Sequence, residues 1–210
     1  MIKSQQARLR KTLEAQGIRD RRVLDVIQQT RRDLFVTEAN RHRAYDDTAL
    51  PITCGQTISQ PYIVAVMTEA LELRSDSKML EIGTGCGYQT AVLSALCGKV
   101  VTVERIGELS EAAHDRLQEL GYDNIDYHIG DGTLGVSTES PFDAIIVTAA
   151  SPQMPPSLFR QLAFGGRMVI PVGNEAIQSL RLVHRTSSSH HQSKELCGCR
   201  FVKLIGAEGW

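Results

Sequence analysis

The stretch that decides the fold is "LEIGTGCGYQT", which runs from Leu80 to Thr90. An apolar run typical of a buried strand leads into it, and a run typical of a helix follows. Three glycines, Gly83, Gly85 and Gly87, occupy alternate positions between the two. Glycines permit a sharp turn and let a ligand approach the backbone closely, whereas a plain strand-to-helix turn needs only one. We therefore predict a ligand-binding loop at the carboxyl end of a sheet.

The spacing of these glycines narrows the class of ligand. Dinucleotide-binding loops read G-x-G-x-x-G and hold a pyrophosphate, whereas this loop reads G-x-G-x-G. Glu81 directly precedes the loop, and a carboxylate there would repel pyrophosphate but suit a ligand with an ammonium group. We predict S-adenosylmethionine, which has an amino acid end and no phosphate. A nicotinamide-dependent oxidoreductase is the less favoured alternative.

Two further acidic positions follow at the expected ends of neighbouring strands. Glu104 comes 21 residues after Gly83, at the usual distance for an acid that accepts hydrogen bonds from ribose hydroxyls. Asp131 and Gly132 lie in "GDG" at the end of the third strand, where they suit an adenine amino group and its ring. The plainer alternatives are a solvated or ion-paired Glu104 and a simple Asp-Gly turn.

Strand and helix patterns alternate on both sides of the loop. This order predicts an α/β fold with a mostly parallel sheet and helices on both faces. We expect one domain over 1–210, with N-terminal helices and a covering segment (residues 33–60) within 1–75 and a Rossmann-like core over 76–210. The expected strands are 78–83, 99–104, 125–131, 142–149 and 166–173, followed by two more around a Ser/His-rich loop; the expected helices are 4–16, 20–30, 62–73, 87–97, 107–121 and 156–163.

Composition excludes several classes of protein. Of 210 residues, 42% are hydrophobic and 22% charged, with a net charge of −1. No window approaches the roughly 18 apolar residues of a spanning helix, and the start lacks an apolar signal region. Five scattered cysteines predict reduced thiols and a cytoplasmic protein. Residues 1–43 hold eleven Lys and Arg against five Asp and Glu, but few aromatic residues accompany them, which disfavours a nucleic-acid partner.

A second polar motif, "GQTISQP", precedes the helix expected at 62–73 and carries Thr57 and Ser59. Ser59 has three possible roles: a nucleophile, a helix cap, or a hydrogen-bond donor to a bound group. A nucleophilic serine needs an activating base within hydrogen-bond reach, and no neighbour in the motif supplies one. Its place just before a helix also suits a cap. We favour the donor.

Together these motifs resemble those of a known enzyme family. "GQTISQP", "LEIGTGCGYQTAVL", "VTVERI", "GDG", "PFDAIIVTAA" and "GGRMVIPVG" have the order and spacing of protein-L-isoaspartate O-methyltransferases. The resemblance implies a Rossmann-like, seven-stranded S-adenosylmethionine-dependent methyltransferase fold. It also implies methylation of the free α-carboxylate of L-isoaspartyl, and some D-aspartyl, residues in damaged proteins. The ester then collapses to a succinimide, which begins repair, and S-adenosylhomocysteine is the other product.

The resemblance also implies roles for particular residues. Two positions depart from the family: Cys86 stands where serine is frequent, and Lys203 stands where many members have proline, which puts the fit of the final strand in question. The family further points to a monomer without a membrane or nucleic-acid partner. By position, Ser59 would contact the acceptor carboxylate, Gln56 and Thr57 would lie near the donor, Gly83, Gly85 and Gly87 would line its methionine end, Glu104 its ribose, and Asp131 with Gly132 its adenine.

The expected chemistry needs no metal, general base or covalent nucleophile, because the acceptor carboxylate is already ionised at neutral pH. "HHQSKELCGC", His190 to Cys199, contains metal-ligating residue types, but its two cysteines are separated by one residue rather than by zinc-site spacing. Two other functions stay open at this point. One is a methyltransferase for a small molecule or nucleic acid, and the other is a donor-binding protein without catalysis.

Overall fold

The strand that precedes the glycine loop lies at the centre of a seven-stranded sheet. A computed structural model describes residues 2–210 and gives the strand order β5-β4-β3-β6-β7-β8-β9. The first five strands in this order are parallel, and β8 pairs antiparallel with both β7 and β9. The strands are β3 (Lys78–Ile82), β4 (Lys99–Glu104), β5 (Ile125–Ile129), β6 (Phe142–Val147), β7 (Leu162–Gly173), β8 (Gln178–Arg185) and β9 (His191–Cys199).

Alternate residues of the central strands supply two apolar clusters, one on each face of the sheet. Met79 and Val100 belong to the first cluster, whereas Leu80 and Val101 belong to the second. Successive strand side chains point to opposite faces, so near-continuous apolar runs fit strands that are covered on both sides. The prediction of a mostly parallel sheet with helices on both faces is confirmed.

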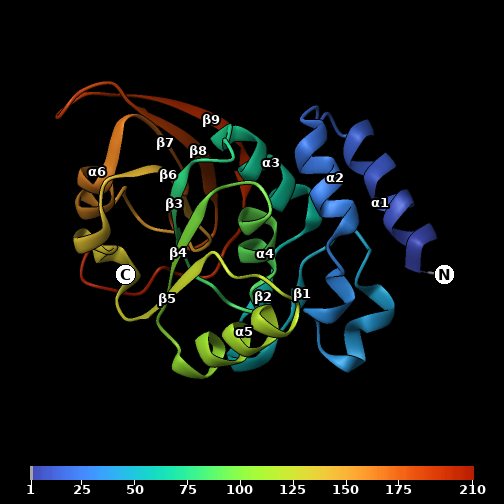
Figure 1. Cartoon of the computed structure of the whole chain (residues 1–210). Helices are drawn as coiled ribbons and strands as arrows, with labels where there is room; N and C mark the ends of the chain where they lie inside the picture. Colours follow the sequence, from blue (N-terminus) through green and yellow to red (C-terminus); the bar gives the residue numbers. More distant parts are fainter. Residues whose placement is uncertain (1) are drawn as a thin grey trace.

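Helices cover the two faces unequally (Figure 1). Residues of three helices join the first apolar cluster: α3 (Pro61–Leu71), α4 (Tyr88–Ser94) and α5 (Gly107–Glu119). The second cluster is closed by α6 (Pro156–Gln161) and by the C-terminal segment through Leu204. Two 3₁₀ turns, η4 (Gly132–Leu134) and η5 (Ser137–Glu139), lie between β5 and β6.

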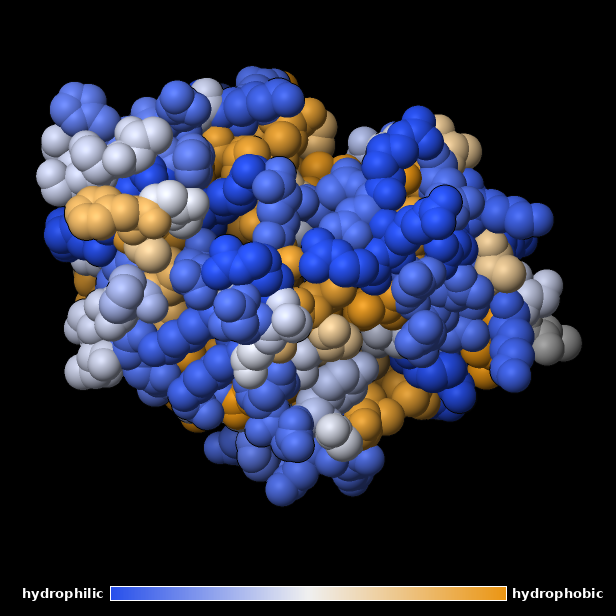
Figure 2. Space-filling view, turned by 45° about the horizontal axis from the view of Figure 1, so that its top comes forward, coloured by the Kyte–Doolittle hydropathy of each residue, from blue (hydrophilic) through white to orange (hydrophobic). Residues whose placement is uncertain are grey.

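Two N-terminal helices, α1 (Ile2–Ala15) and α2 (Arg21–Gln29), pack outside α3 and α4 (Figure 1). Leu13 and Leu24 are buried in the same cluster as Met79 of the central strand. Asp20 begins α2 as a side-chain cap, because its carboxylate accepts from the Arg22 N–H. The face of the molecule shown in Figure 2 is mostly hydrophilic, and apolar residues show mainly in the gaps between polar ones.

The covering segment is ordered and contains short elements that the sequence did not predict. Leu50 and Ile58 are buried and pair across a two-stranded antiparallel ladder, which ties the segment to the first apolar cluster. Its polar stretch therefore has a fixed backbone without a long helix or strand. The elements are η1 (Arg32–Leu34), η2 (Glu38–Arg43), β1 (Leu50–Pro51), η3 (Thr53–Gly55) and β2 (Thr57–Ile58).

Three strands end earlier than predicted: β3 ends one residue early, at Ile82, and the shorter β5 and β6 bear on the site. β5 ends at Ile129 and β6 at Val147, so Asp131 and Thr148 lie on turns at the carboxyl edge of the sheet. The two strands predicted around a Ser/His-rich loop are confirmed as β8 and β9. Among residues 2–210, none of the helices has the length and apolar character that crossing a membrane requires.

Candidate functional site

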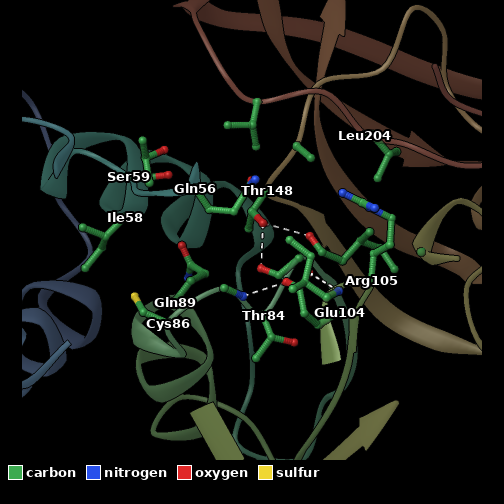
Figure 3. Close-up of a pocket in the computed structure, with 18 of the residues that line it drawn as sticks. Gln56, Ile58, Ser59, Thr84, Cys86, Gln89, Glu104, Arg105, Thr148 and Leu204 are labelled. Carbon is green, nitrogen blue, oxygen red and sulfur yellow. Dashed lines mark hydrogen bonds between the residues drawn. The ribbon is translucent and has the colours of Figure 1, made fainter. Parts of the chain in front are cut away.

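A cavity of about 240 Å³ opens where the covering segment faces the carboxyl ends of β3, β4 and β6 (Figure 3). Connections leave β3 toward β4 on one side and enter β6 on the other, which is the switch point where open α/β sheets bind ligands. Seven of the nine predicted site residues line the cavity: Gln56, Thr57, Ser59, Gly83, Gly85, Glu104 and Gly132.

Gly83 begins the loop in a conformation that only glycine adopts easily. Its φ is +93°, and a Cβ there would lie 2.3 Å from the Thr148 hydroxyl oxygen. That hydroxyl donates to the carbonyls of Gly83 and Ile82 at 2.8 and 2.9 Å. The Gly83 N–H in turn donates to the Val103 carbonyl at 2.8 Å. The first glycine is thus held from both neighbouring strands.

The other two glycines divide between the cavity and the helix behind it. Gly85, at φ +55°, lines the cavity, and its N–H donates to the Glu104 carboxylate at 2.9 Å. Gly87, at φ +86°, precedes α4, and a Cβ there would come within 3.0 Å of Leu117 on α5. Gly87 therefore lies outside the lining, and its lack of a side chain serves the packing of α5 against the loop.

Glu104 is buried and has both carboxylate oxygens engaged by backbone N–H groups. It accepts from Gly85 at 2.9 Å and from Ile106 at 3.0 Å, and only 7% of it is exposed. None of the ion pairs found in residues 2–210 includes it. The plainer alternatives, a solvated or ion-paired carboxylate, do not describe this residue.

The "GDG" turn places its two predicted residues differently. Gly132 lines the cavity and packs directly against Ile82, since a Cβ there would lie 2.5 Å from the Ile82 side chain. Asp131 lies outside the lining and accepts from the Thr133 N–H and hydroxyl and from the Ala207 N–H. Burial pulls the pKa of Asp131 upward, but these hydrogen bonds outweigh it and hold the pKa below its usual value.

Glu81 corrects one step of the sequence argument. Its side chain is fully buried beneath the loop and outside the cavity lining, with one oxygen accepting from Thr90 at 2.6 Å and Thr102 at 2.8 Å. Burial raises the pKa of Glu81 to about 8, so the carboxyl is neutral at pH 7. The Thr102 hydroxyl also bonds that of Thr84 in the loop at 2.6 Å. Glu81 supports the loop and does not offer a charge to a ligand.

Ser59 reaches the cavity from the covering segment, opposite Glu104 (Figure 3). It is half-buried, and its hydroxyl makes no hydrogen bond to any residue from 2 to 210, whereas its carbonyl accepts from Arg32 at 2.7 Å. Gln60 is the cap position of α3 and makes no side-chain cap bond, so Ser59 does not cap this helix. No histidine lines the cavity, and a nucleophilic serine would lack its base.

Sequence reasoning missed several residues of the lining. Gln89, two positions after the last loop glycine, donates to Thr68 at 3.0 Å, and Thr148 was assigned to a strand rather than to the cavity. Val202 to Ile205 also line it, although of these four the sequence singled out only Lys203, as a departure from the family. Lys203 pairs with Glu175 at 2.7 Å, and its N–H makes no backbone hydrogen bond within residues 2–210. A proline at that position would therefore cost no backbone hydrogen bond.

The Cys/His-rich stretch belongs to the sheet edge and not to the cavity. Cys197 and Cys199 share a face of β9 and pack against the first apolar cluster as free thiols. Within residues 2–210, no three side chains of the metal-ligating types His, Cys, Asp or Glu come together as a metal site. Both thiols are half-buried.

Comparison with known sequences identifies the family. The sequence model of the protein-L-isoaspartate(D-aspartate) O-methyltransferase family matches residues 4–209. The chain belongs to this family. It is 54% identical over 199 residues to protein-L-isoaspartate O-methyltransferase 2 of Pelobacter propionicus, covering 94% of this chain and 88% of the relative.

Solved structures agree with this membership. A protein-L-isoaspartate O-methyltransferase superposes with a TM-score of 0.87 at 29% identity, over 97% of this chain and 67% of its own. A Plasmodium falciparum chain assigned to the same enzyme, solved with S-adenosyl-L-homocysteine, gives 0.81 at 24% identity, over 94% and 96%. At that identity the second likeness bears on the fold.

The residues of this site fit the family's methyl donor, S-adenosylmethionine. The glycine loop exposes backbone at Gly83 and Gly85, the buried Glu104 carboxylate suits hydroxyl donors, and Ile82 with Gly132 gives the cavity an apolar wall against which a flat ring could lie. A Cβ at Gly132 would displace Ile82 from this wall. The prediction of this donor from the glycine spacing is confirmed, although the charge argued for Glu81 is not part of the reason.

Proposed function

We propose that this chain uses its cavity to methylate the free α-carboxylate of L-isoaspartyl, and some D-aspartyl, residues in damaged proteins and peptides. The methyl ester collapses to a succinimide, and its hydrolysis returns part of the damaged material to normal aspartate. One observation carries the proposal: the partner-free Ser59 hydroxyl and the glycine loop face the same cavity. Membership of the family over residues 4–209 supports it independently.

On the donor side, the chain contributes backbone and one carboxylate. Gly83 and Gly85 would lie along the methionine end, Glu104 would accept from the ribose, and Gly132 would face the adenine. S-adenosylmethionine, when bound, supplies a methyl group on a sulfonium and its own leaving group. In this proposal Gly87 and Asp131 act from behind the lining, since Gly87 begins α4 and Asp131 fixes the turn at Gly132.

On the acceptor side, the chain contributes position and the exclusion of water. A carboxylate with an ordinary pKa of roughly 3.5 to 4 is ionised at neutral pH, so no base has to remove a proton. Ser59 would donate its hydroxyl to one carboxylate oxygen and fix its approach to the methyl group, with Gln56 and Thr57 nearby. Correct positioning can contribute up to about 7–11 kcal/mol to the rate.

The same proposal covers partners and location. The substrates are isoaspartyl-containing proteins and peptides, and the enzyme works as a cytoplasmic monomer without nucleic acid. Five free cysteines, one of them exposed at Cys54, support a reducing compartment. The described residues 2–210 complete the cavity within one chain, which supports a monomer.

The experiment that tests this function offers labelled S-adenosylmethionine with two matched peptides, one isoaspartyl and one normal aspartyl. We expect base-labile label on the isoaspartyl peptide alone, because only its free α-carboxylate sits where Ser59 would hold it. Equal labelling of both peptides would reject the substrate. Donor binding without labelling of either would favour a methyltransferase for another acceptor or a donor-binding protein.

A further inference from the structure

Arg32 is a fully buried cation without a carboxylate beside it. Its exposed fraction is 0%, and the ion pairs found in residues 2–210 do not include it. Nε donates to the Ala44 carbonyl at 2.9 Å and Nη2 to the Ser59 carbonyl at 2.7 Å, while Nη1 has no partner. Buried arginines are normally paired with a carboxylate. Burying one without such a partner lowers stability, which suggests that the charge has a function.

The guanidinium lies one layer behind the wall of the cavity. Its central carbon is 4.7 Å from the centroid of the Tyr88 ring, and both Tyr88 and Ser59 line the cavity. The neighbouring acids make no ion pair with Arg32: Asp33 pairs with Arg31, whereas Asp47 accepts from Gln60 and the Tyr62 N–H and acts on the Arg32 charge only through space. The positive charge is therefore closest to the part of the cavity that Ser59 borders.

We propose that Arg32 is a positioning residue for the acceptor. It fixes the backbone of Ser59 and holds a positive charge behind the acceptor site, and this charge favours the anionic carboxylate over the neutral methyl ester. The inference rests on the proposed function, because it needs a carboxylate acceptor. Arg32 touches neither reactant in this account and acts through Ser59 and Tyr88.

The balance of the reaction decides where this charge has its effect. A bond forms between the carboxylate oxygen and the methyl carbon, the carbon–sulfur bond breaks, and its electron pair stays on sulfur. The acceptor thus changes from an anion to a neutral ester, and no proton moves. A cation attracts the anionic carboxylate and not the neutral ester, so Arg32 lowers the KM of the substrate and leaves release of the product unchanged.

Paired variants separate the charge from the hydrogen bonds. We expect Arg32→Gln, which removes the charge, to raise the KM for an isoaspartyl peptide by about tenfold, while inhibition by the methyl ester product and donor affinity change less than twofold. Arg32→Lys keeps the charge and should retain most of the preference for the anionic peptide over the neutral methyl ester. Arg22→Met removes an exposed guanidinium that is paired with Asp20, and the preference for the carboxylate over the ester should stay unchanged.

If Arg32→Gln weakened the binding of the peptide and of the methyl ester equally, the proposed role of the charge would be wrong. Arg32 would then only anchor the backbone. Should that variant not fold, the wild-type enzyme gives a second measurement. A peptide with a neutral carboxamide in place of the α-carboxylate should bind about tenfold more weakly, and the difference should persist in 1 M salt, because salt screens buried charges little.

If the difference in binding between the carboxylate and carboxamide peptides vanished in 1 M salt, exposed cations of the lining, Arg105 and Lys203, would be its source. That result would contradict the proposal. Failure of the proposed function gives a different result, since the wild-type enzyme would then label the isoaspartyl and normal aspartyl peptides equally or label neither. The two failures are therefore distinguishable in the same set of assays.

Discussion

The glycine loop and the covering segment face each other across one cavity, and they are built in opposite ways. In the loop, backbone groups are fixed by hydrogen bonds with residues at the ends of two neighbouring strands, Val103 and Glu104 of β4 and Thr148 after β6. In the covering segment the backbone is held from behind by Arg32, while the hydroxyls of Thr57 and Ser59 make no hydrogen bond within residues 2–210.

This difference teaches which side of the cavity recognises which reactant. A donor that is the same in every turnover can be held by fixed backbone, which needs no adjustment when it binds. An acceptor on many different damaged proteins needs a few free donors at the one group that all substrates share. The free side chains of the covering segment meet that need, and the loop does not.

The largest effect is expected for Gly83→Ala, which changes the glycine loop, where the backbone is fixed. A Cβ there would displace the Thr148 hydroxyl and occupy a left-handed backbone conformation. We expect about 2–4 kcal/mol of lost stability and more than a hundredfold weaker donor binding, measured by urea unfolding and calorimetry. Gly121→Ala, at φ +82° with nothing near its Cβ, is the control and should lose only about 1–2 kcal/mol. Similar losses in both variants would contradict the role of Thr148.

The next largest effect is expected for Ser59→Ala, which removes a free hydroxyl from the covering segment. Loss of a hydrogen bond to a charged group costs about 1.5–3 kcal/mol, so kcat should fall about 10- to 100-fold while donor affinity stays unchanged. Turnover with an isoaspartyl peptide and donor calorimetry measure the two quantities. Ser59→Thr keeps a hydroxyl and should recover part of the rate. Wild-type turnover in a folded Ser59→Ala sample would refute the assignment.

Glu104→Gln should weaken donor binding by about tenfold, because an amide accepts from ribose hydroxyls less strongly than a carboxylate does. The amide oxygen can still accept from the Gly85 N–H, but the amide NH2 then faces the Ile106 N–H, so we expect a loss of about 1–3 kcal/mol of stability in a chain that still folds. Calorimetry with the donor gives the affinity, and the exposed neighbour Glu108→Gln serves as the control. An unchanged affinity would place the ribose elsewhere.

The last prediction concerns the pH dependence of stability that Glu81 causes, which we express as a change per pH unit. Its pKa is raised to about 8 in the folded protein, against roughly 4.3 unfolded, so its contribution to stability is full below the unfolded value. That contribution should fall by about 1.4 kcal/mol per pH unit up to about pH 8. In urea unfolding, the stability of Glu81→Gln relative to the wild type should rise with pH over this range. The relative stability of the exposed variant Glu111→Gln should not. Parallel curves would mean that Glu81 is ionised in the folded state.

Much of the fold followed from the sequence because its signals are local. Glycine spacing marked the loop, and alternating strand and helix patterns gave the sheet. Glu81 was misjudged because a strand alternates its faces: Leu80 and Ile82 point to the second apolar cluster, so Glu81 points away under α4. The sequence shows that a carboxylate precedes the loop but not which face carries it.

The rest of the site depends on contacts between residues far apart in the chain. Thr148 holds Gly83 across 65 positions, and nothing near either residue marks the pair. Arg32 lies in "TRRDL", where an arginine looks like any solvated charge, yet it is fully buried against Ser59 and Tyr88. Burial of this kind appears only when the covering segment has folded onto the sheet.

The division of roles across the cavity can be tested in one experiment, by measuring the rate of methyl transfer to an isoaspartyl peptide while the donor concentration rises to saturation. Glu104→Gln should regain the wild-type rate at saturating donor, because it weakens only donor binding. Ser59→Ala should stay about 10- to 100-fold slower at any donor concentration. Recovery of Ser59→Ala at high donor, or a lasting defect in Glu104→Gln, would contradict the account.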